Sequence, residues 1–379
     1  MTLFAHCGLA DIIVVPELHS TLIADDNVKL ETTGGRHATS IEISPRLDVH
    51  HQTERAELHL RAAVTARRFD HDKTLDSNDQ KADFYGDYRF EKSIFQWNVG
   101  LDNRNTLSSE REETGLIETA GQRRKWQLQP QWSKQLSERT QMSVQYSWFD
   151  IDYRGSASKG LLDYTFQEIA SRLSYRFSEK QKMHGLFHVS NYRVEVSQLT
   201  TRMVGLSIGL DQFMSEKSEL SLSGGVRIYE NKQTLKRSIQ CVKLSEQSHA
   251  LILKIAWKMS LHQGQLATAY IRSLTPSGTG SMMQEDQLNL FAKYQLKERN
   301  RLAFSLKVLR QGKLANTDND RFLSYMDTAY KYQLKKNVLT SLGYRFTAQY
   351  YQHATKTAFS NQAVISVEYT WDRVKLDYF

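Results

Sequence analysis

Side chains in residues 337–350 alternate between two kinds. Apolar residues occupy most even positions, and small, polar or basic residues occupy most odd positions. Successive side chains of a β-strand point to opposite faces, whereas a helical period of 3.6 would scatter the charges around the axis. The segment therefore predicts a strand with one apolar face. That face is either buried in a soluble sandwich or turned towards lipid in an outer-membrane barrel.

The same alternation recurs along the chain, with apolar stripes at 58–66, 204–210, 251–259, 302–308 and 365–371. A one-residue shift of register would move a whole stripe to the opposite face, so each stripe assigns its strand an orientation. In a barrel, Leu206, Ile255, Phe304 and Val367 are predicted to face lipid. The residues between them are predicted to face the lumen.

Short charged links separate pairs of these segments, at 53–55, 91–93, 137–139, 178–180, 215–217, 260–262, 297–299 and 335–337. They recur at intervals of roughly 40 residues, the length of two membrane strands and one longer loop. Longer polar stretches lie between the links, at 70–80, 103–115, 230–240, 275–286 and 311–320. Short turns at one rim and long loops at the other are typical of an outer-membrane barrel, with the short turns on the periplasmic side.

The eight links predict an all-β fold, a transmembrane antiparallel up-and-down β-barrel of about 18 strands. The alternative is 16 strands, if residues 17–31 stay outside the wall. The chain has only 4 Pro and no linker-like stretch, so residues 11–379 are expected to form a single barrel domain.

Composition excludes a bundle of transmembrane helices, because mean hydropathy is −0.55 and no long apolar run occurs. It does not exclude a barrel, in which every second residue can be polar. The aromatic content of 11% favours strands and supplies interfacial girdles. Outer-membrane lipid and lipopolysaccharide are the expected surroundings. The terminal Phe379 is the kind of residue that the outer-membrane assembly machinery reads.

Residues 1–10 are expected to be the tail of a signal peptide, because an apolar stretch ends in small residues before Asp11. The alternative is an ordinary ragged N-terminus. Removal of Cys7 would leave Cys241 unpaired, so neither a disulfide framework nor a cysteine zinc site is expected.

Residues 25–69 resemble the opening of a family of outer-membrane β-barrel porins encoded in exopolysaccharide and exosortase-associated loci of Gram-negative bacteria. The resemblance rests on Asp26-Asn27-Val28, on Ile43-Ser44-Pro45 before the first turn, and on the later strands that end at Ser-Glu-Arg or Ser-Glu-Lys links. It implies a location in the bacterial outer membrane and a role in transport. It implies no catalytic residues.

Cations outnumber anions on the faces assigned to the lumen. The basic residues predicted to line an anion path are Arg61, Arg67, Arg172, Arg176, Arg227, Lys254, Lys258, Lys307 and Arg345. The anions predicted on the same face are Glu42, Asp48, Glu57, Asp87, Glu168, Asp327 and Glu368. The whole chain carries a formal net charge of +8. An excess of positive charge in a narrow channel favours anion entry, whereas pairing across neighbouring strands would make the same residues a stabilising ladder.

Catalytic, metal and nucleic-acid functions find little support. Gly-x-Ser-x-Gly occurs at 205–209, but lies within a strand and lacks the strand-turn-helix geometry of a nucleophile elbow. Neither His-Glu-x-x-His nor Cys-x-x-Cys occurs, so no metal or other cofactor is predicted. The basic residues are spread over all the strands, which argues against a nucleic-acid partner.

The sequence thus predicts a porin-like channel linked to exopolysaccharide export or to passage of anionic solutes. A plugged barrel serving as a structural or adhesive anchor is the alternative. An outer-membrane lipid-modifying enzyme is a third alternative.

Overall fold

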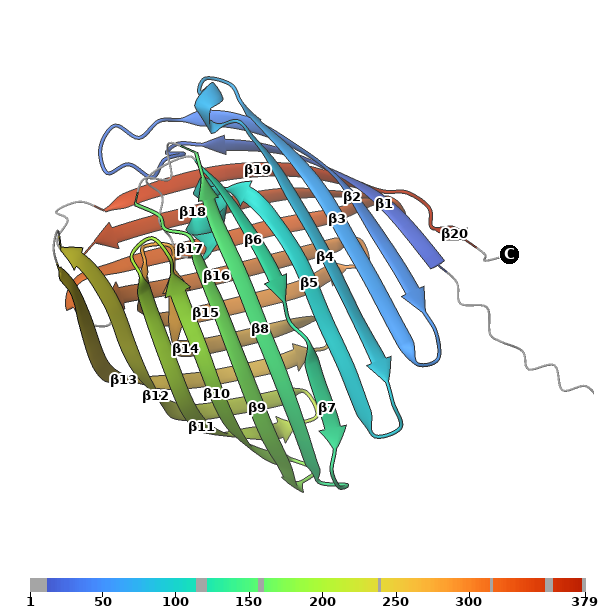
Figure 1. The fold of residues 1–379 in the computed structure, drawn as a ribbon. Helices are drawn as coiled ribbons and strands as arrows, with labels where there is room; N and C mark the ends of the chain where they lie inside the picture. The colour runs from blue at the N-terminus through green and yellow to red at the C-terminus, as the bar shows by residue number, and fades with distance from the viewer. Residues whose placement is uncertain are drawn as a thin grey trace, which may run out of the picture.

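The computed structural model describes residues 12–113, 121–155, 160–237, 240–313, 316–351 and 357–376, which form one antiparallel sheet closed into a barrel (Figure 1). The first ten strands are β1 (Ile12–Asp25), β2 (Ala38–Gln52), β3 (Ala56–Phe69), β4 (Ser77–Arg89), β5 (Ser93–Asn105), β6 (Gln122–Leu128), β7 (Gln131–Gln135), β8 (Thr140–Arg154), β9 (Tyr164–Ser178) and β10 (Gln181–Val194). The others are β11 (Leu199–Ser215), β12 (Ser218–Arg237), β13 (Gln240–Leu261), β14 (Gly264–Ser277), β15 (Ser281–Lys297), β16 (Asn300–Lys313), β17 (Asn316–Lys335), β18 (Val338–Tyr351), β19 (Ala358–Thr370) and β20 (Val374–Leu376). A 3-10 turn η1 (Lys73–Leu75) and a helix α1 (Thr106–Glu113) lie in the connections.

The wall of the barrel has 18 strands. Strands β6 and β7 are two pieces of one wall strand, because each of them pairs with both β5 and β8. Strand β20 pairs only with Ile12–Val14 of β1, beside the stretch of β1 that pairs with β19. The predicted fold and strand number are therefore confirmed. The 16-strand alternative is wrong, since Glu17–Asp25 pair on both sides and belong to the wall.

The outer face of the wall is apolar and uncovered. Leu206, Ile255 and Val367 lie on it with exposed fractions of 62%, 42% and 43%, while Ser207 on the opposite face is buried. A closed barrel satisfies its backbone hydrogen bonds within the wall, which lipid requires. Such a barrel with an apolar exterior is a protein of the bacterial outer membrane. Within the described part of the chain, no helix has the length and apolar character needed to cross a membrane.

The short turns lie where the sequence predicted them, within one or two residues. They are 53–55, 90–92, 136–139, 179–180, 216–217, 262–263, 298–299 and 336–337. Because the strands run up and down, all eight turns lie at the same rim. This rim is called the turn rim below, and the other end is called the loop rim.

The long loops predicted at 230–240, 275–286 and 311–320 are wrong in extent. Most of these residues belong to strands: 230–237 to β12, 275–277 and 281–286 to β14 and β15, and 311–313 and 316–320 to β16 and β17. Polar side chains are tolerated in strands that line an aqueous lumen, so polarity did not distinguish strand from loop here. A connection at 26–37 was not predicted. Residues 1–10 and Phe379 lie outside the described residues.

The barrel closes where β1 meets β19, and the loop-rim end of this seam is held by side chains. The buried carboxylate of Asp25 accepts hydrogen bonds from Ser360 Oγ at 2.8 Å and from Gln362 Nε2 at 2.7 Å. It also accepts one from the backbone N–H of Asn27 at 2.8 Å. Asp26 bonds both the backbone and the side chain of Asn361 at 2.7 Å. The motif Asp26-Asn27 thus lies in the closing contact of the barrel.

We expect Asp25→Ala to lower the free energy of unfolding by about 2–4 kcal/mol, because it leaves buried donors of Ser360 and Gln362 without their charged acceptor. Urea unfolding in lipid vesicles measures the change. Asp26→Ala is the control, since its bonds are exposed, and its effect should be smaller. Equal effects of the two substitutions would contradict this role of Asp25.

Candidate functional site

All nine basic residues predicted for the lumen lie on one face of the sheet. The strand register links them through directly opposed pairs such as Glu42 with Arg67, and Asp327 with Arg345. This face is the inner one, because Arg67, Lys307 and Arg345 line the same cavity of about 470 Å³ although they come from β3, β16 and β18. Whether these residues form an anion path depends on which of them are neutralised.

Four of the nine form ion pairs across strands. Arg61 lies 3.1 Å from Asp48, Arg67 2.5 Å from Glu42, Arg227 3.3 Å from Glu168 and Arg345 2.9 Å from Asp327. Three of these pairs join neighbouring strands, and the Arg227–Glu168 pair reaches from β12 to β9. At these four positions the second interpretation, a stabilising ladder of paired charges, is correct. Because each arginine is neutralised by a carboxylate, it contributes little to the electric field of the lumen.

Four others have no ion-pair partner within 4.0 Å among the described residues: Arg172 and Arg176 on β9, and Lys254 and Lys258 on β13. Their side chains are exposed on the inner face, in the half of the barrel near the turn rim. Lys182 of β10 is directly opposite Arg176 and also has no such partner. These five residues are called the basic wall below. Their positive charges are not neutralised by any carboxylate of the described residues at ion-pair distance.

Helix α1 lies inside the barrel, so the prediction that 103–115 is an outward-facing loop is wrong (Figure 1). Its Glu110 is 1% exposed and lies 3.3 Å from Nε of Arg123, which is 2% exposed. Tyr153 donates its hydroxyl to the same carboxylate at 2.8 Å. This latch, made of Glu110, Arg123 and Tyr153, fastens α1 to the inner face of β6 and β8. The alternation of apolar and polar residues did not predict this contact, since Glu110 lies in a stretch that is polar apart from Leu107.

The loop-rim end of the hairpin β14–β15 is folded into the lumen. Strand β14 pairs with β13 only up to Arg272 and beyond that pairs with β15 alone. Leu274 and Met282, which by register belong to the outer face of the hairpin, are 6% and 3% exposed. They pack in one cluster with Tyr192 and Met203, which belong to the inner face of β10 and β11. The outer face of this hairpin end therefore rests on the inner face of the neighbouring strands β10–β13.

Polar contacts fix the folded-in hairpin end. Tyr192 donates its hydroxyl to the carbonyl of Ser277 at 2.8 Å, and the backbone N–H of Leu162 donates to the carbonyl of Gly278 at 2.7 Å. A Cβ on Gly278 would lie 2.4 Å from the Tyr153 hydroxyl, so only glycine fits against the latch. The hairpin end and α1 thus meet at Tyr153 and narrow the loop-rim half of the lumen together.

The connection 26–37 covers the other side of the loop rim. Leu30 packs on Leu309, Leu323 and Ala358 of the inner wall. Lys29 binds the carboxylate of Asp72 at 3.1 Å and so joins this connection to the one after β3. Hydrogen bonds from the Thr74 side chain and from Lys29 hold the pKa of the Asp72 carboxyl at about 2. The connection is therefore fixed by charge as well as by apolar packing.

The Gly-x-Ser-x-Gly stretch has a packing explanation. Glycines 205 and 209 of β11 lie opposite His188 and His184 of β10. A Cβ on Gly205 would approach His188 Nε2 to 2.0 Å, and a Cβ on Gly209 would approach His184 Nε2 to 2.3 Å. The glycines make room for the two imidazoles, and neither imidazole is hydrogen-bonded to Ser207. The arrangement lacks the contact that activates a serine nucleophile.

No family model matches the chain, and no curated protein matches it. Among solved structures, it is similar to OccAB4 of Acinetobacter baumannii, with 12% identity and a TM-score of 0.49 over 97% of this chain and 99% of that one. It is similar to the outer membrane protein OpdK of Pseudomonas aeruginosa, with 8% identity and a TM-score of 0.48 over 94% and 99%. It is also similar to OccK2 (OpdF) of Pseudomonas aeruginosa solved with glucuronate, with 11% identity and a TM-score of 0.48 over 95% and 98%. At these identities the likeness concerns the fold alone.

We expect Gly205→Ala to lower the free energy of unfolding by about 1–3 kcal/mol, because the added methyl overpacks against His188. The double variant Gly205→Ala/His188→Ala should be less destabilised than the sum of the two single variants. Urea unfolding measures all three. Gly224→Ala is the control, since the Cβ would contact only Leu253, at 3.8 Å. Additive effects at 205 and 188 would contradict the packing explanation.

We expect Glu110→Ala to release α1, because it removes the buried carboxylate that Arg123 and Tyr153 bind, a loss of about 3 kcal/mol or more. Single-channel recording in a planar bilayer should then show a larger and noisier conductance. Ser108→Ala on the same helix is the control, since Ser108 bonds only a backbone carbonyl of the preceding strand. A conductance equal to that of the unsubstituted protein would show that α1 does not narrow the path.

Proposed function

We propose that the protein is a porin-like channel that passes small anionic solutes across the outer membrane. An 18-stranded barrel is of the size at which porins enclose an aqueous channel. The observation that carries the anion preference is the basic wall, which lies on the inner face without ion-pair partners among the described residues. The paired residues of the predicted anion path contribute less, because each has a carboxylate beside it.

Position supports this division of roles. Helix α1 and the end of the hairpin β14–β15 narrow the half of the lumen near the loop rim. The basic wall lies in the other half, near the turn rim. A solute that passes the narrow half then meets positive charge in a water-filled space with low-dielectric walls. Such a field raises the local concentration of anions and lowers that of cations.

We expect Arg172→Gln/Arg176→Gln/Lys254→Gln to reduce the preference for chloride over potassium, measured as the reversal potential in a KCl gradient. The effect should be large at about 0.1 M salt, where the Debye length is about 10 Å, and should fade in molar salt. Arg345→Gln/Asp327→Asn is the matched control, because it removes an ion pair and leaves the net charge unchanged. A cation-selective unsubstituted channel would refute the proposal.

The finer proposal is that the solute is an acidic polysaccharide. It is supported only by the resemblance in residues 25–69 to porins of exopolysaccharide loci, and the motif Asp26-Asn27 already has a role in barrel closure. An acidic oligosaccharide such as oligogalacturonate should block the current at lower concentration than a neutral dextran oligomer of the same length. Equal block by both would restrict the proposal to small anions.

The second candidate function is a plugged barrel that anchors a surface structure. It is favoured by the buried apolar cluster inside the lumen, where Tyr192, Val194 and Met203 have no exposed surface. A protein with this function would give no conductance, and Glu110→Ala would not open it. Planar-bilayer recording therefore separates the two functions.

A further inference from the structure

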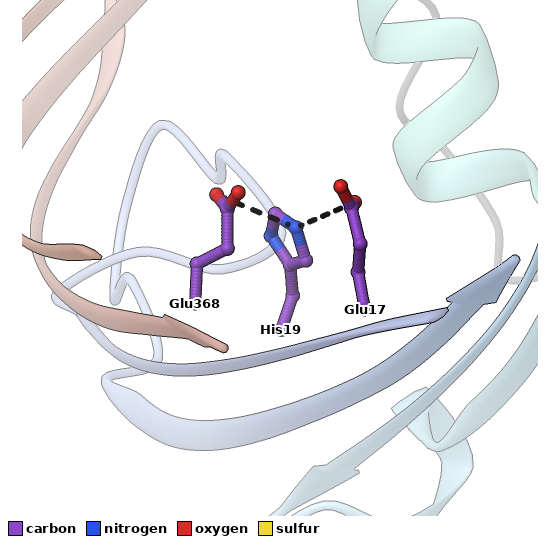
Figure 2. A group of neighbouring side chains, drawn as sticks. All are labelled: Glu17, His19 and Glu368. Carbon is purple, nitrogen blue, oxygen red and sulfur yellow. Dashed lines mark ion pairs between the residues drawn. The ribbon is translucent and has the colours of Figure 1, made fainter. Parts of the chain in front are cut away.

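Three potential metal ligands converge on the inner face of the seam (Figure 2). Glu17 and His19 come from β1, and Glu368 comes from β19. The Nε2 atom of His19 lies 3.6 Å from Oε2 of Glu17 and 3.4 Å from Oε2 of Glu368. One ligand atom from each residue lies within 4.8 Å of the other two. His19 and Glu368 are directly opposite each other in the register, so the barrel closure itself brings the ligands together.

Within the described part of the chain, Glu17 and Glu368 lack the arginine partner that the other lumenal acids have. Among the described residues, neither Glu17 nor Glu368 has a lysine or arginine within 4.0 Å. The other lumenal acids named above, such as Glu42 and Asp327, each have an arginine at that distance. Two carboxylates that converge on one imidazole without a basic partner repel each other, and a cation between them would relieve the repulsion.

Arg46 indicates the state of the imidazole. Its Nη1 atom lies 3.2 Å from Nε2 of His19. A guanidinium can only donate, so Nε2 accepts this hydrogen bond when the ring is neutral with its proton on Nδ1. In that tautomer the lone pair lies on the nitrogen that faces both carboxylates, as a metal ligand requires.

We propose that Glu17, His19 and Glu368 bind a divalent transition-metal ion of the zinc class. Zinc bonds of about 2.0–2.1 Å at tetrahedral angles separate their ligands by about 3.3 Å, close to the two distances at His19. One nitrogen and two carboxylate oxygens suit zinc and its neighbours better than calcium or magnesium. Three protein ligands leave a fourth position for water from the lumen.

The bound ion takes the place of Arg46 at Nε2. It also joins β1 to β19 at a point between the Asp25 contacts and the start of β1, so it fastens the seam a second time. This site does not depend on the channel proposal, since neither the basic wall nor α1 contributes a ligand.

Titration of the untagged, metal-free protein in detergent with Co²⁺ tests the site, because tetrahedral Co²⁺ gives intense visible absorption. One ion should bind per chain. His19→Gln and Glu368→Gln should each weaken binding by at least about tenfold. His59→Gln is the matched control, because His59 is another lumenal histidine beside a carboxylate, and its loss should leave binding unchanged. Folding of each variant is checked by its heat-dependent migration in gels.

Arg46→Gln should act in the opposite direction and tighten Co²⁺ binding, since it removes the competing cation without removing a ligand. Bound Co²⁺ or Zn²⁺ should also raise the temperature at which the barrel unfolds, and should not do so in Glu368→Gln. Absence of a bound ion, or binding that survives both ligand substitutions in folded protein, would overturn the proposal. Weaker binding in Arg46→Gln would overturn the assigned geometry.

Discussion

The requirement that every backbone hydrogen bond be satisfied in lipid controls this structure. A sheet with an apolar outer face has no stable edge in a bilayer, so β1 must pair with β19. This closure takes place at the seam between β1 and β19. Polar side chains meet there whose contacts cannot be deduced from the alternation of apolar and polar residues along a strand. Asp25 and Asp26 hold one part of it. The convergence of Glu17, His19 and Glu368 is a consequence of the same closure.

Closure also turns one sheet face into an enclosed compartment whose charges are sorted by position. Arginines such as Arg61 and Arg67 lie directly opposite acids on neighbouring strands and form pairs. In the basic wall, Arg172 is opposite Leu186 and Ser143, and Arg176 is opposite Lys182, so no carboxylate is directly opposite either arginine. Register alone does not distinguish the two regions, since Asp211 is opposite Lys182 and Glu219 is opposite Lys258. The ion-pair distances do.

Features that depend on strand period were predictable from the sequence, and features that depend on contacts across the lumen were not. The two-residue alternation and the charged links are local, and they gave the strand number, the faces around Leu206 and Ile255, and the turn rim. The pairing of Arg345 with Asp327 required the register between two strands. The inward position of α1 required the contacts of Glu110 with Arg123, on the next strand, and with Tyr153, one wall strand further along the chain.

Because the end of the hairpin β14–β15 folds inward, evolutionary selection constrains the side chains differently at the two ends of β15. Met282 and Leu288 belong to the same face of β15, yet Met282 is 3% exposed and Leu288 is 44% exposed. At Leu288, any apolar side chain is tolerated, since the fluid lipid chains adapt to its shape. At Met282 and Leu274, the shape of the side chain must match the aromatic cluster on the inner face of the neighbouring strands. On the outer face of β15, apolar residues near the turn rim should therefore replace one another freely during evolution. Near the loop rim, only side chains of similar volume should be accepted.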